Sequence, residues 1–158
     1  MPVIYLVRHA HAVTEEENKL RPLSARGHDE CRRLVAFFQN NRAFTPAEFW
    51  HSPLIRAKET AGLIRSLAPH AALRETLGLL PEDRPEKMAA RLATLAPTLM
   101  LAIVGHEPHL SALATLLVTG RSGLTAFDLE KGAVLCLASE DSHTWSVRWH
   151  IAPSILPP

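Results

Sequence analysis

Arginine and histidine residues follow three apolar segments of the chain. Arg8 and His9 come directly after the first segment, Arg56 lies shortly after the second, and His106 follows the third. A guanidinium group can bind two phosphate oxygens at once, and a neutral imidazole can act as a nucleophile in group transfer. These residue types therefore predict a phosphoryl-transfer site. The sequence has no Gly-rich phosphate loop, no Cys-x5-Arg pocket and no HExxH or Asp-rich cluster, so we expect catalysis without a metal ion or other cofactor.

The elements that carry these residues alternate between strands and helices. The predicted strands are apolar runs at residues 3–7, 48–51 and 99–104, closed by a pair at 133–138 and 144–150. The predicted helices follow Ser24, begin at Ser52-Pro53, extend from Pro85 through Leu95, and start at Pro108. Strands that are apolar throughout are typical of sheets covered on both faces, so the sequence predicts a three-layer α/β/α sandwich with a mainly parallel sheet. Ligands bind at the carboxyl ends of such strands, which is where the arginines and histidines would meet.

We expect one domain over residues 1–152, because 158 residues are the size of a single compact unit. Residues 153–158 include prolines, which cannot continue a strand, and we expect them to form a loose C-terminal tail. Trp145 and Trp149 alternate with Val147 along the last predicted strand, which predicts one packed face. His11 and His109 flank the site motifs and could line the mouth of the site, but we expect both to be solvated loop or cap residues.

The overall charge excludes several classes of partner. The chain has 17 Lys and Arg against 16 Asp and Glu, a net charge of +1, which does not supply the basic surface of a nucleic-acid-binding protein. No apolar run approaches the ~20 residues of a membrane span, and the N-terminal run lacks the basic residues of a signal peptide. Cys31 and Cys136 form neither a disulfide framework nor a metal-binding motif, which indicates a reducing compartment. We therefore expect a cytoplasmic monomer that binds neither nucleic acid nor membranes.

The same residues lie in motifs of a known family. Residues 8–10, Arg-His-Ala, resemble the Arg-His-Gly signature of the histidine phosphatase superfamily, which has the phosphoglycerate-mutase-like fold. Residues 52–61, Ser-Pro-Leu-x-Arg-Ala-x-x-Thr-Ala, resemble that family's second arginine motif, and residues 105–106, Gly-His, resemble its second histidine. Residues 21–27, Arg-Pro-Leu-Ser-x-x-Gly, are similar to a segment of the compact SixA-type phosphohistidine phosphatases. These motifs occur in the family's order, and the resemblance extends over nearly the whole chain.

The resemblance implies a role for each site residue. His9 would be the nucleophile that is transiently phosphorylated, and Arg8, Arg56 and His106 would bind the phosphoryl oxygens. Arg21 would be a further phosphate contact, or it would instead pair with a nearby acidic run. The arginines should disfavour protonation of His9, and its second ring nitrogen should donate to a backbone carbonyl, which would fix the tautomer.

The sequence departs from the family's pattern in two places. Ala10 stands where the family has glycine, so the backbone there must avoid a conformation that only glycine adopts. Larger relatives carry an acidic residue that protonates the leaving oxygen, but Glu82 and Asp83 lie in no matching pattern and are only candidate general acids. Imidazole is a better leaving group than an alkoxide, so the lack of a clear acid favours a phosphohistidine substrate.

The sequence thus predicts a phosphatase that removes phosphate from phosphohistidine in a signalling or phosphotransfer protein. The short segments at residues 18–22 and 79–85 predict an open, shallow pocket, which suits a protein-borne substrate. One alternative is a phosphatase of small phosphomonoesters that uses Glu82 or Asp83 as the acid. A second alternative is an inactive module that binds a phosphorylated ligand, and the intact His9 argues against it.

Overall fold

The computed structural model describes all residues from 1 to 158 and contains a single six-stranded sheet. Its strands are β1 (Val3–Arg8), β2 (Glu48–His51), β3 (Ala72–Glu75), β4 (Met100–Gly105), β5 (Val134–Ser139) and β6 (Trp145–Ile151). The sheet order is β3-β2-β4-β1-β5-β6. The first four strands pair in parallel, whereas β5 pairs antiparallel with both β1 and β6. The helices are α1 (Ala25–Asn41), α2 (Ile55–Ile64), α3 (Pro85–Leu92) and α4 (His109–Thr119).

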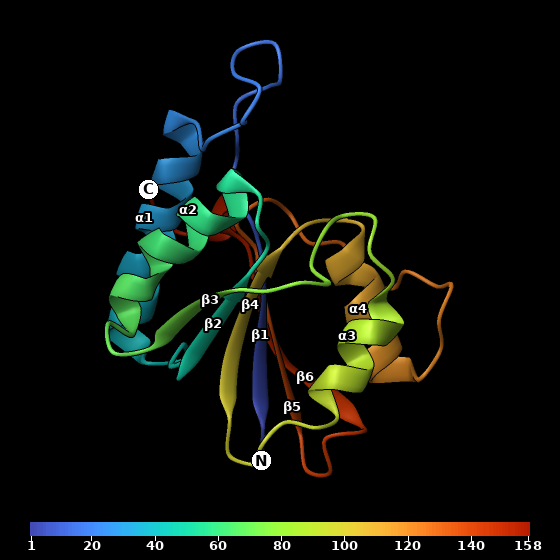
Figure 1. Cartoon of the computed structure of the whole chain (residues 1–158). Coiled ribbons are helices and arrows are strands. Elements are labelled where there is room, and N and C mark those ends of the chain that lie inside the picture. Colours follow the sequence, from blue (N-terminus) through green and yellow to red (C-terminus); the bar gives the residue numbers. More distant parts are fainter.

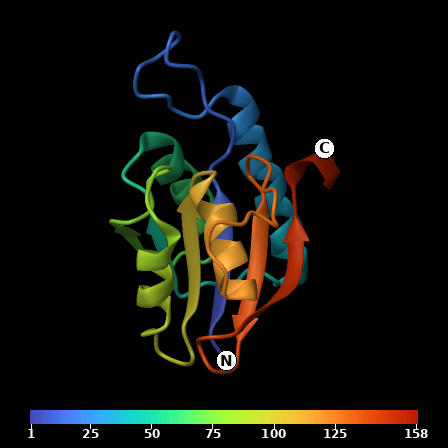
Figure 2. The same cartoon turned by 90° about the vertical axis from the view of Figure 1, so that its right-hand side faces the viewer.

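Helices cover both faces of this sheet. Figure 1 shows α1 and α2 on one face and α3 and α4 on the other, and Figure 2 shows the sheet behind α3 and α4. The predicted three-layer sandwich with a mainly parallel sheet is therefore confirmed. No helix of the chain has the length and apolar character that a membrane crossing requires.

The central strand β1 is apolar throughout because both of its faces are buried. Tyr5 and Val7 belong to the core between the sheet and α1–α2, whereas Ile4 and Leu6 belong to the core on the α3–α4 side. All four side chains are at most 2% exposed. Because β4 and β5 flank β1, the residue that follows β1 emerges in the middle of the sheet's carboxyl edge.

Two predicted helices have different limits in the structure. The helix expected from Ser52-Pro53 begins at Ile55, and Ser52 is not its cap. The Ser52 hydroxyl accepts from the Leu54 N–H at 3.2 Å and lies 2.7 Å from a ring nitrogen of His106. The third helix ends at Leu92, earlier than expected. The serine of the second arginine motif therefore belongs to the candidate site.

The expectation of a loose C-terminal tail is wrong. Residues Pro153–Ile155 form a short 3-10 helix, and the side chains of Pro153 and Leu156 are buried. Arg33 donates to the Pro153 carbonyl at 3.2 Å, and the Ser154 hydroxyl donates to Glu130 at 2.6 Å. Proline prevents a strand here but does not prevent Leu156 from packing into the core beside α1.

The expectation of one packed face along β6 is also wrong. Trp145 lies in the core on the α3–α4 side, whereas Trp149 packs against the opposite core and Val147 is 43% exposed. A register shift between Cys136 and Leu137 of β5 explains the difference, because it inserts a bulge into the pairing with β6. A bulge of this kind reverses the alternation of side chains along the strand that follows it.

Gly27 allows α1 to approach the loop after β1, and its replacement tests that packing. A Cβ atom at Gly27 would lie 2.0 Å from the His11 carbonyl oxygen, so we expect Gly27→Ala to lower the free energy of unfolding by about 1–3 kcal/mol. The matched control is Gly62→Ala in α2, where a Cβ would meet nothing within 4 Å. That change should raise stability by about 0.5–1 kcal/mol. Urea unfolding of both variants measures the effects, and a Gly27→Ala protein as stable as the wild type would contradict the packing described.

Candidate active site

Backbone hydrogen bonds to two other segments fix the position of Arg8 and His9. The Arg8 N–H donates to the Ala133 carbonyl at 3.0 Å, and the His9 N–H donates to the Gly105 carbonyl at 2.9 Å. The Arg8 guanidinium donates through Nη1 to the Leu129 carbonyl at 2.7 Å, while its Nε is buried without a partner. Arg8 therefore keeps donors free while its backbone is held at the carboxyl edge of the sheet.

His9 has the tautomer and the charge that a nucleophile needs. Its Nδ1 lies 2.7 Å from the Ala10 carbonyl oxygen, to which it donates, so Nε2 keeps its lone pair. The ring is 5% exposed, and burial lowers its pKa to about 3, with smaller contributions from the charges of His106, Arg56 and Arg8. His9 is thus neutral at physiological pH. The expected bond to a backbone carbonyl is present, but burial lowers the pKa more than the arginines do.

Alanine at position 10 does not disturb this arrangement. Ala10 is fully buried and is not among the residues with positive φ, so it adopts no glycine-only conformation. The Ala10 N–H donates to Thr60 Oγ1 at 3.0 Å, and the Thr60 hydroxyl donates to the Arg56 carbonyl at 2.7 Å. Thr60 therefore links the backbone after His9 to the first turn of α2. Packing of the helix alone would not require these two hydrogen bonds.

His106 directly follows β4 and lies beside His9. The centroids of the two rings are 5.1 Å apart. The Ser52 hydroxyl accepts from the Leu54 N–H and lies 2.7 Å from His106 Nε2, to which it can donate when the ring proton of His106 is on Nδ1. Nδ1 is buried and has no partner in the protein. In that tautomer Nδ1 can donate to a phosphoryl oxygen.

Positive charges surround His106. Burial lowers its pKa to about 3, followed by the charges of Arg56, His109, Arg8 and Arg21. Arg56 lies in the first turn of α2 with its Nε buried and unpartnered, and burial and the charge of Arg21 lower its pKa. Unpaired donors and cations gathered at one strand edge are suited to a bound anion.

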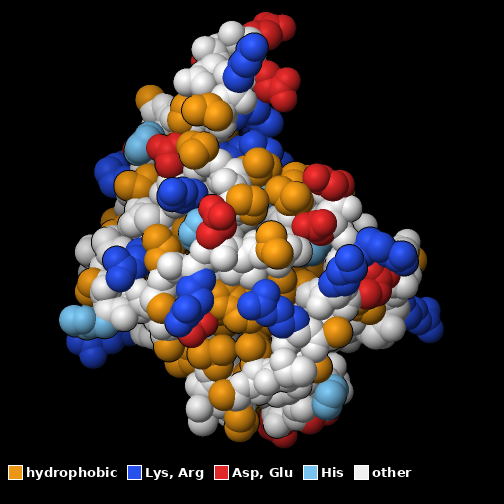
Figure 3. Space-filling model, viewed as in Figure 1, with side chains coloured by type: hydrophobic (Ala, Val, Ile, Leu, Met, Phe, Trp, Pro, Cys, Tyr) orange, Lys and Arg blue, Asp and Glu red, His pale blue; other side chains and the backbone are white.

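Arg21 reaches the site from the loop between β1 and α1. Residues 14–20 of this loop are exposed and form a lobe above the body of the protein (Figures 1 and 3). Arg21 has a left-handed φ of 48°, and its Nε donates to the Val13 carbonyl at 3.1 Å. It forms no ion pair with the acidic run of the loop. Its charge lowers the pKa of both Arg56 and His106. The structure thus brings Arg8, His9, Arg21, Arg56 and His106 together.

The two candidate general acids, Glu82 and Asp83, differ in their hydrogen bonds and exposure. Asp83 accepts from the Leu80 N–H at 2.8 Å and so stabilises its own loop, while Glu82 is exposed without a hydrogen bond. Neither carboxylate contributes to the pKa shifts of His9 or His106. Within the chain, no three His, Cys, Asp or Glu side chains are arranged to hold a metal ion.

Three further residues at the site were not assigned from the sequence. Ser52 is hydrogen-bonded to His106, and Lys131 lies in the loop before β5, where the charges of Arg8 and Arg21 lower its pKa. His109 is 1% exposed, so the expectation that it is solvated is wrong, and neither of its ring nitrogens has a partner. Ser52 and His109 could have been found from the sequence, because Ser52 lies in a motif that points to the site and His109 flanks another, whereas Lys131 lies in no such motif.

The charge state of the two site histidines can be measured directly. We expect NMR titration of the His9 and His106 rings to give midpoints near pH 3, far below the ~6.5 of an exposed histidine. Between those pH values the unfolded chain binds more protons than the folded one. The stability that the neutral rings contribute is therefore complete above about pH 6.5 and is lost as the pH falls toward 3. Ring titration near pH 6.5 in the folded protein would contradict the buried, neutral site.

Comparison with known proteins agrees with this geometry. Residues 4–85, about half of the chain and including Arg8, His9 and Arg56, match the family model of the histidine phosphatase superfamily (branch 1). The chain belongs to this superfamily. An uncharacterised protein of Picosynechococcus sp. is 30% identical over 146 residues, which cover 86% of this chain and 84% of that relative. Membership of the superfamily supports phosphatase chemistry for this chain.

Solved structures share the fold at low sequence identity. The protein histidine phosphatase SixA, complexed with tungstate, superposes with a TM-score of 0.80 at 18% identity, covering 96% of this chain and 97% of SixA. The α-ribazole phosphatase of Shigella flexneri gives 0.73 at 18% identity over 92% and 94% of the two chains. The phosphoserine phosphatase of Entamoeba histolytica, in complex with 3-phosphoglyceric acid, gives 0.72 at 15% identity over 96% and 98%. The phosphoglycerate-mutase-like fold is therefore shared by phosphatases that are named for different substrates.

Proposed function

We propose that the protein is a cofactor-free phosphohistidine phosphatase that acts on a phosphorylated histidine of a signalling or phosphotransfer protein. The observation that carries the proposal is His9 itself, which is neutral, held in one tautomer and surrounded by Arg8, Arg56 and His106. His9 Nε2 attacks phosphorus, and the P–N bond to the substrate imidazole breaks. Water then attacks the phosphorus of phosphorylated His9, which releases inorganic phosphate and regenerates the free imidazole.

Electrostatics support the phosphoryl-transfer step. The transferred group carries negative charge on its equatorial oxygens, and catalysis depends mainly on cations and donors placed around it. Arg8, Arg21 and Arg56 supply permanent positive charge, and His106 Nδ1 supplies a neutral donor. His9 and His106 both have low pKa values, so the cationic site does not compete with its own nucleophile for a proton.

The choice of phosphohistidine over a phosphomonoester rests on the leaving group. An alkoxide needs a proton donor, but Asp83 is bonded to Leu80 and Glu82 faces solvent. The short segments at residues 18–22 and 79–85 favour an open site, which suits a protein-borne substrate. The fold's similarity to the protein histidine phosphatase SixA agrees with this choice.

A comparison of substrates tests the proposal. Wild type, Glu82→Gln and Asp83→Asn proteins are assayed with EDTA present, on a phosphohistidine protein and on a panel of phosphomonoesters. Asparagine keeps the oxygen that accepts from Leu80, so Asp83→Asn removes the acid but not the loop contact. We expect phosphohistidine to be hydrolysed preferentially and each variant to change its kcat/KM by less than about tenfold.

A phosphomonoester phosphatase would give a different pattern. A positioned general acid is typically worth about 10²–10⁴ in rate, so one of the two variants would then lose most of its phosphomonoester activity. Rapid wild-type phosphomonoester cleavage that either variant abolishes would overturn the phosphohistidine assignment. A requirement for added Mg²⁺ would overturn the cofactor-free reaction.

A further inference from the structure

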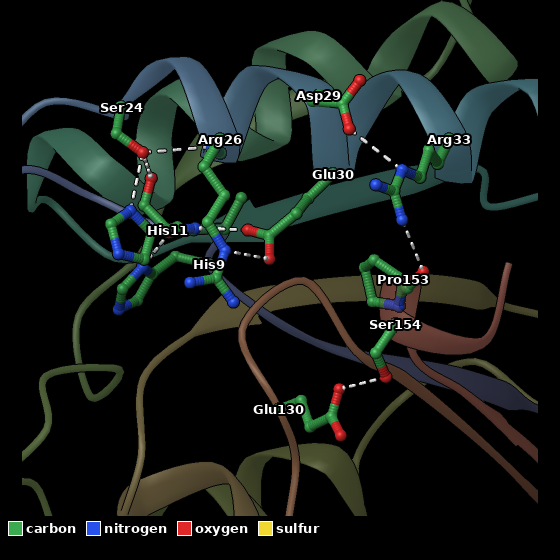
Figure 4. Close-up of polar contacts among 12 residues, drawn as sticks. His9, His11, Ser24, Arg26, Asp29, Glu30, Arg33, Glu130, Pro153 and Ser154 are labelled. Atoms are coloured by element: carbon green, nitrogen blue, oxygen red, sulfur yellow. Dashed lines mark hydrogen bonds and ion pairs between the residues drawn. The ribbon is translucent and has the colours of Figure 1, made fainter. Parts of the chain in front are cut away.

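A polar cavity of about 580 Å³ lies beside the phosphoryl-binding residues and has no role in the chemistry described above. Figure 4 shows His9 and His11 at one end of this region and Pro153 and Ser154 at the other. Helix α1 forms one wall, and the loop that carries Glu130 forms the opposite wall. The packed C-terminal segment therefore lines one end of a cavity whose other end is lined by His11, two residues after His9.

All but one of the charged side chains of this cavity form an ion pair or a hydrogen bond within the protein. Asp29 binds Arg33 at 2.9 Å, and Glu130 accepts from Ser154 at 2.6 Å. Glu30 is 9% exposed, accepts from the backbone N–H of His11 at 2.7 Å, and lies 3.8 Å from Arg26. The remaining charged side chain is Lys131, which forms no ion pair and no hydrogen bond.

The backbone holds Lys131 between the cavity and the phosphoryl site. The N–H of the next residue, Gly132, donates to the carbonyls of both Arg8 and His9, each at 3.1 Å. Gly132 has φ +77°, and a Cβ there would lie 2.9 Å from the ring of Pro153, so a larger residue would not fit. The loop that presents Lys131 is thus fixed to the residue pair that carries the nucleophile.

Lys131 lies in a positive electrostatic field. Burial lowers its pKa first, the charges of Arg8 and Arg21 lower it further, and Glu30 opposes them in part. The ammonium is half-buried among cations and lacks an anionic partner at bonding distance. An unpaired cation in such a place is stabilised by an anion that the substrate brings.

We propose that this cavity is a second anion-binding subsite, in which Lys131 binds an acidic side chain of the substrate protein beside its phosphorylated residue. The inference rests on the proposed function, since only a protein-borne substrate has a chain that continues past the phosphoryl group. Arg8, Arg21 and Arg56 already supply cations to the phosphoryl group itself. The cavity has no hydrophobic lining residue, so it suits a hydrated segment and not an apolar one.

The test compares two peptides that carry a stable phosphohistidine analogue, phosphoryltriazolylalanine, flanked by either glutamate or glutamine. Fluorescence anisotropy gives the dissociation constants for wild type, Lys131→Met and the control Lys58→Met, which removes an exposed lysine on α2 that has no partner. We expect wild type and Lys58→Met to bind the glutamate peptide about fivefold more tightly than the glutamine peptide. Lys131→Met should abolish that preference while it binds the glutamine peptide as the wild type does.

The remaining outcomes separate the two proposals. Equal binding of both peptides by the wild type would overturn the subsite and leave the proposed function intact. Equal weakening of both peptides by Lys131→Met would also overturn it, because Lys131 would then bind the phosphoryl group. Failure of the wild type to bind either peptide, with phosphomonoesters still hydrolysed, would overturn the proposed function and the subsite with it.

Discussion

Replacement of His9 by alanine is expected to lower kcat/KM by at least about 10⁴-fold on every substrate that the wild type hydrolyses. His106 is not placed to replace it, because its Nε2 is hydrogen-bonded to the Ser52 hydroxyl. Steady-state kinetics measure the loss. The control is His70→Ala, which removes an exposed histidine and should leave the rate unchanged.

The protein should remain folded when His9 is replaced, since His9 is a small part of the buried core. The thermal unfolding transition of His9→Ala therefore shows whether activity is lost because the nucleophile is missing or because the protein is unfolded. A folded His9→Ala protein that keeps more than about a tenth of wild-type kcat/KM would show that another residue is the nucleophile.

Replacement of Arg56 by alanine is expected to lower kcat/KM by about 10²–10³-fold. The guanidinium lies in the first turn of α2 with an unpartnered, buried Nε, and its charge acts on both site histidines. Arg56→Lys should recover only part of the loss, because lysine keeps the positive charge but cannot make a bidentate contact with two phosphoryl oxygens. The control is Arg121→Ala, which removes an exposed arginine far along the chain from the site motifs.

The pH dependence of kcat for Arg56→Ala distinguishes two roles for Arg56. A group that binds the transferred phosphoryl lowers kcat at every pH, whereas a group that only keeps His9 unprotonated would have an effect confined to acidic pH. A loss below about threefold at neutral pH would contradict direct contact with the phosphoryl group.

Much of the fold could be predicted from the sequence because periodicity and burial agree along most of the chain. The apolar residues of β1 are buried on both faces, and Ser24 caps α1 by accepting from Gly27, as its position predicted. Strand β3 was missed because it has only four residues at the edge of the sheet, three of them exposed. A strand so short and polar has no periodic signal.

Features that depend on tertiary contacts could not be predicted. The position of Trp149 depends on a bulge in β5–β6 pairing, which alternation along a single strand cannot show. The packing of the C-terminal segment depends on Arg33 and Glu130, which are distant in sequence. In both cases a contact with another part of the chain decided where the residues lie.

The candidate site was predictable to the extent that its residues end strands or begin helices. Arg8, His9, Arg56 and His106 do so, and the structure brings them to one edge of the sheet. Lys131 could not be found in this way, because its loop is held at the site by hydrogen bonds between residues 129–133 and Arg8 and His9, which are distant in sequence. The residues around Lys131 contain no sequence motif that predicts this contact.

The central claim is that His9 carries the phosphoryl group during turnover, and the most direct measurement is to trap it there. The wild type is mixed with a phosphorylated substrate, quenched within the first turnover, and digested for mass spectrometry under alkaline conditions, which preserve phosphohistidine. We predict one phosphoryl group on the peptide that contains His9, sensitive to acid and absent from His9→Ala. Phosphate on another residue, or steady turnover with no phosphorylated protein at any time, would contradict the account.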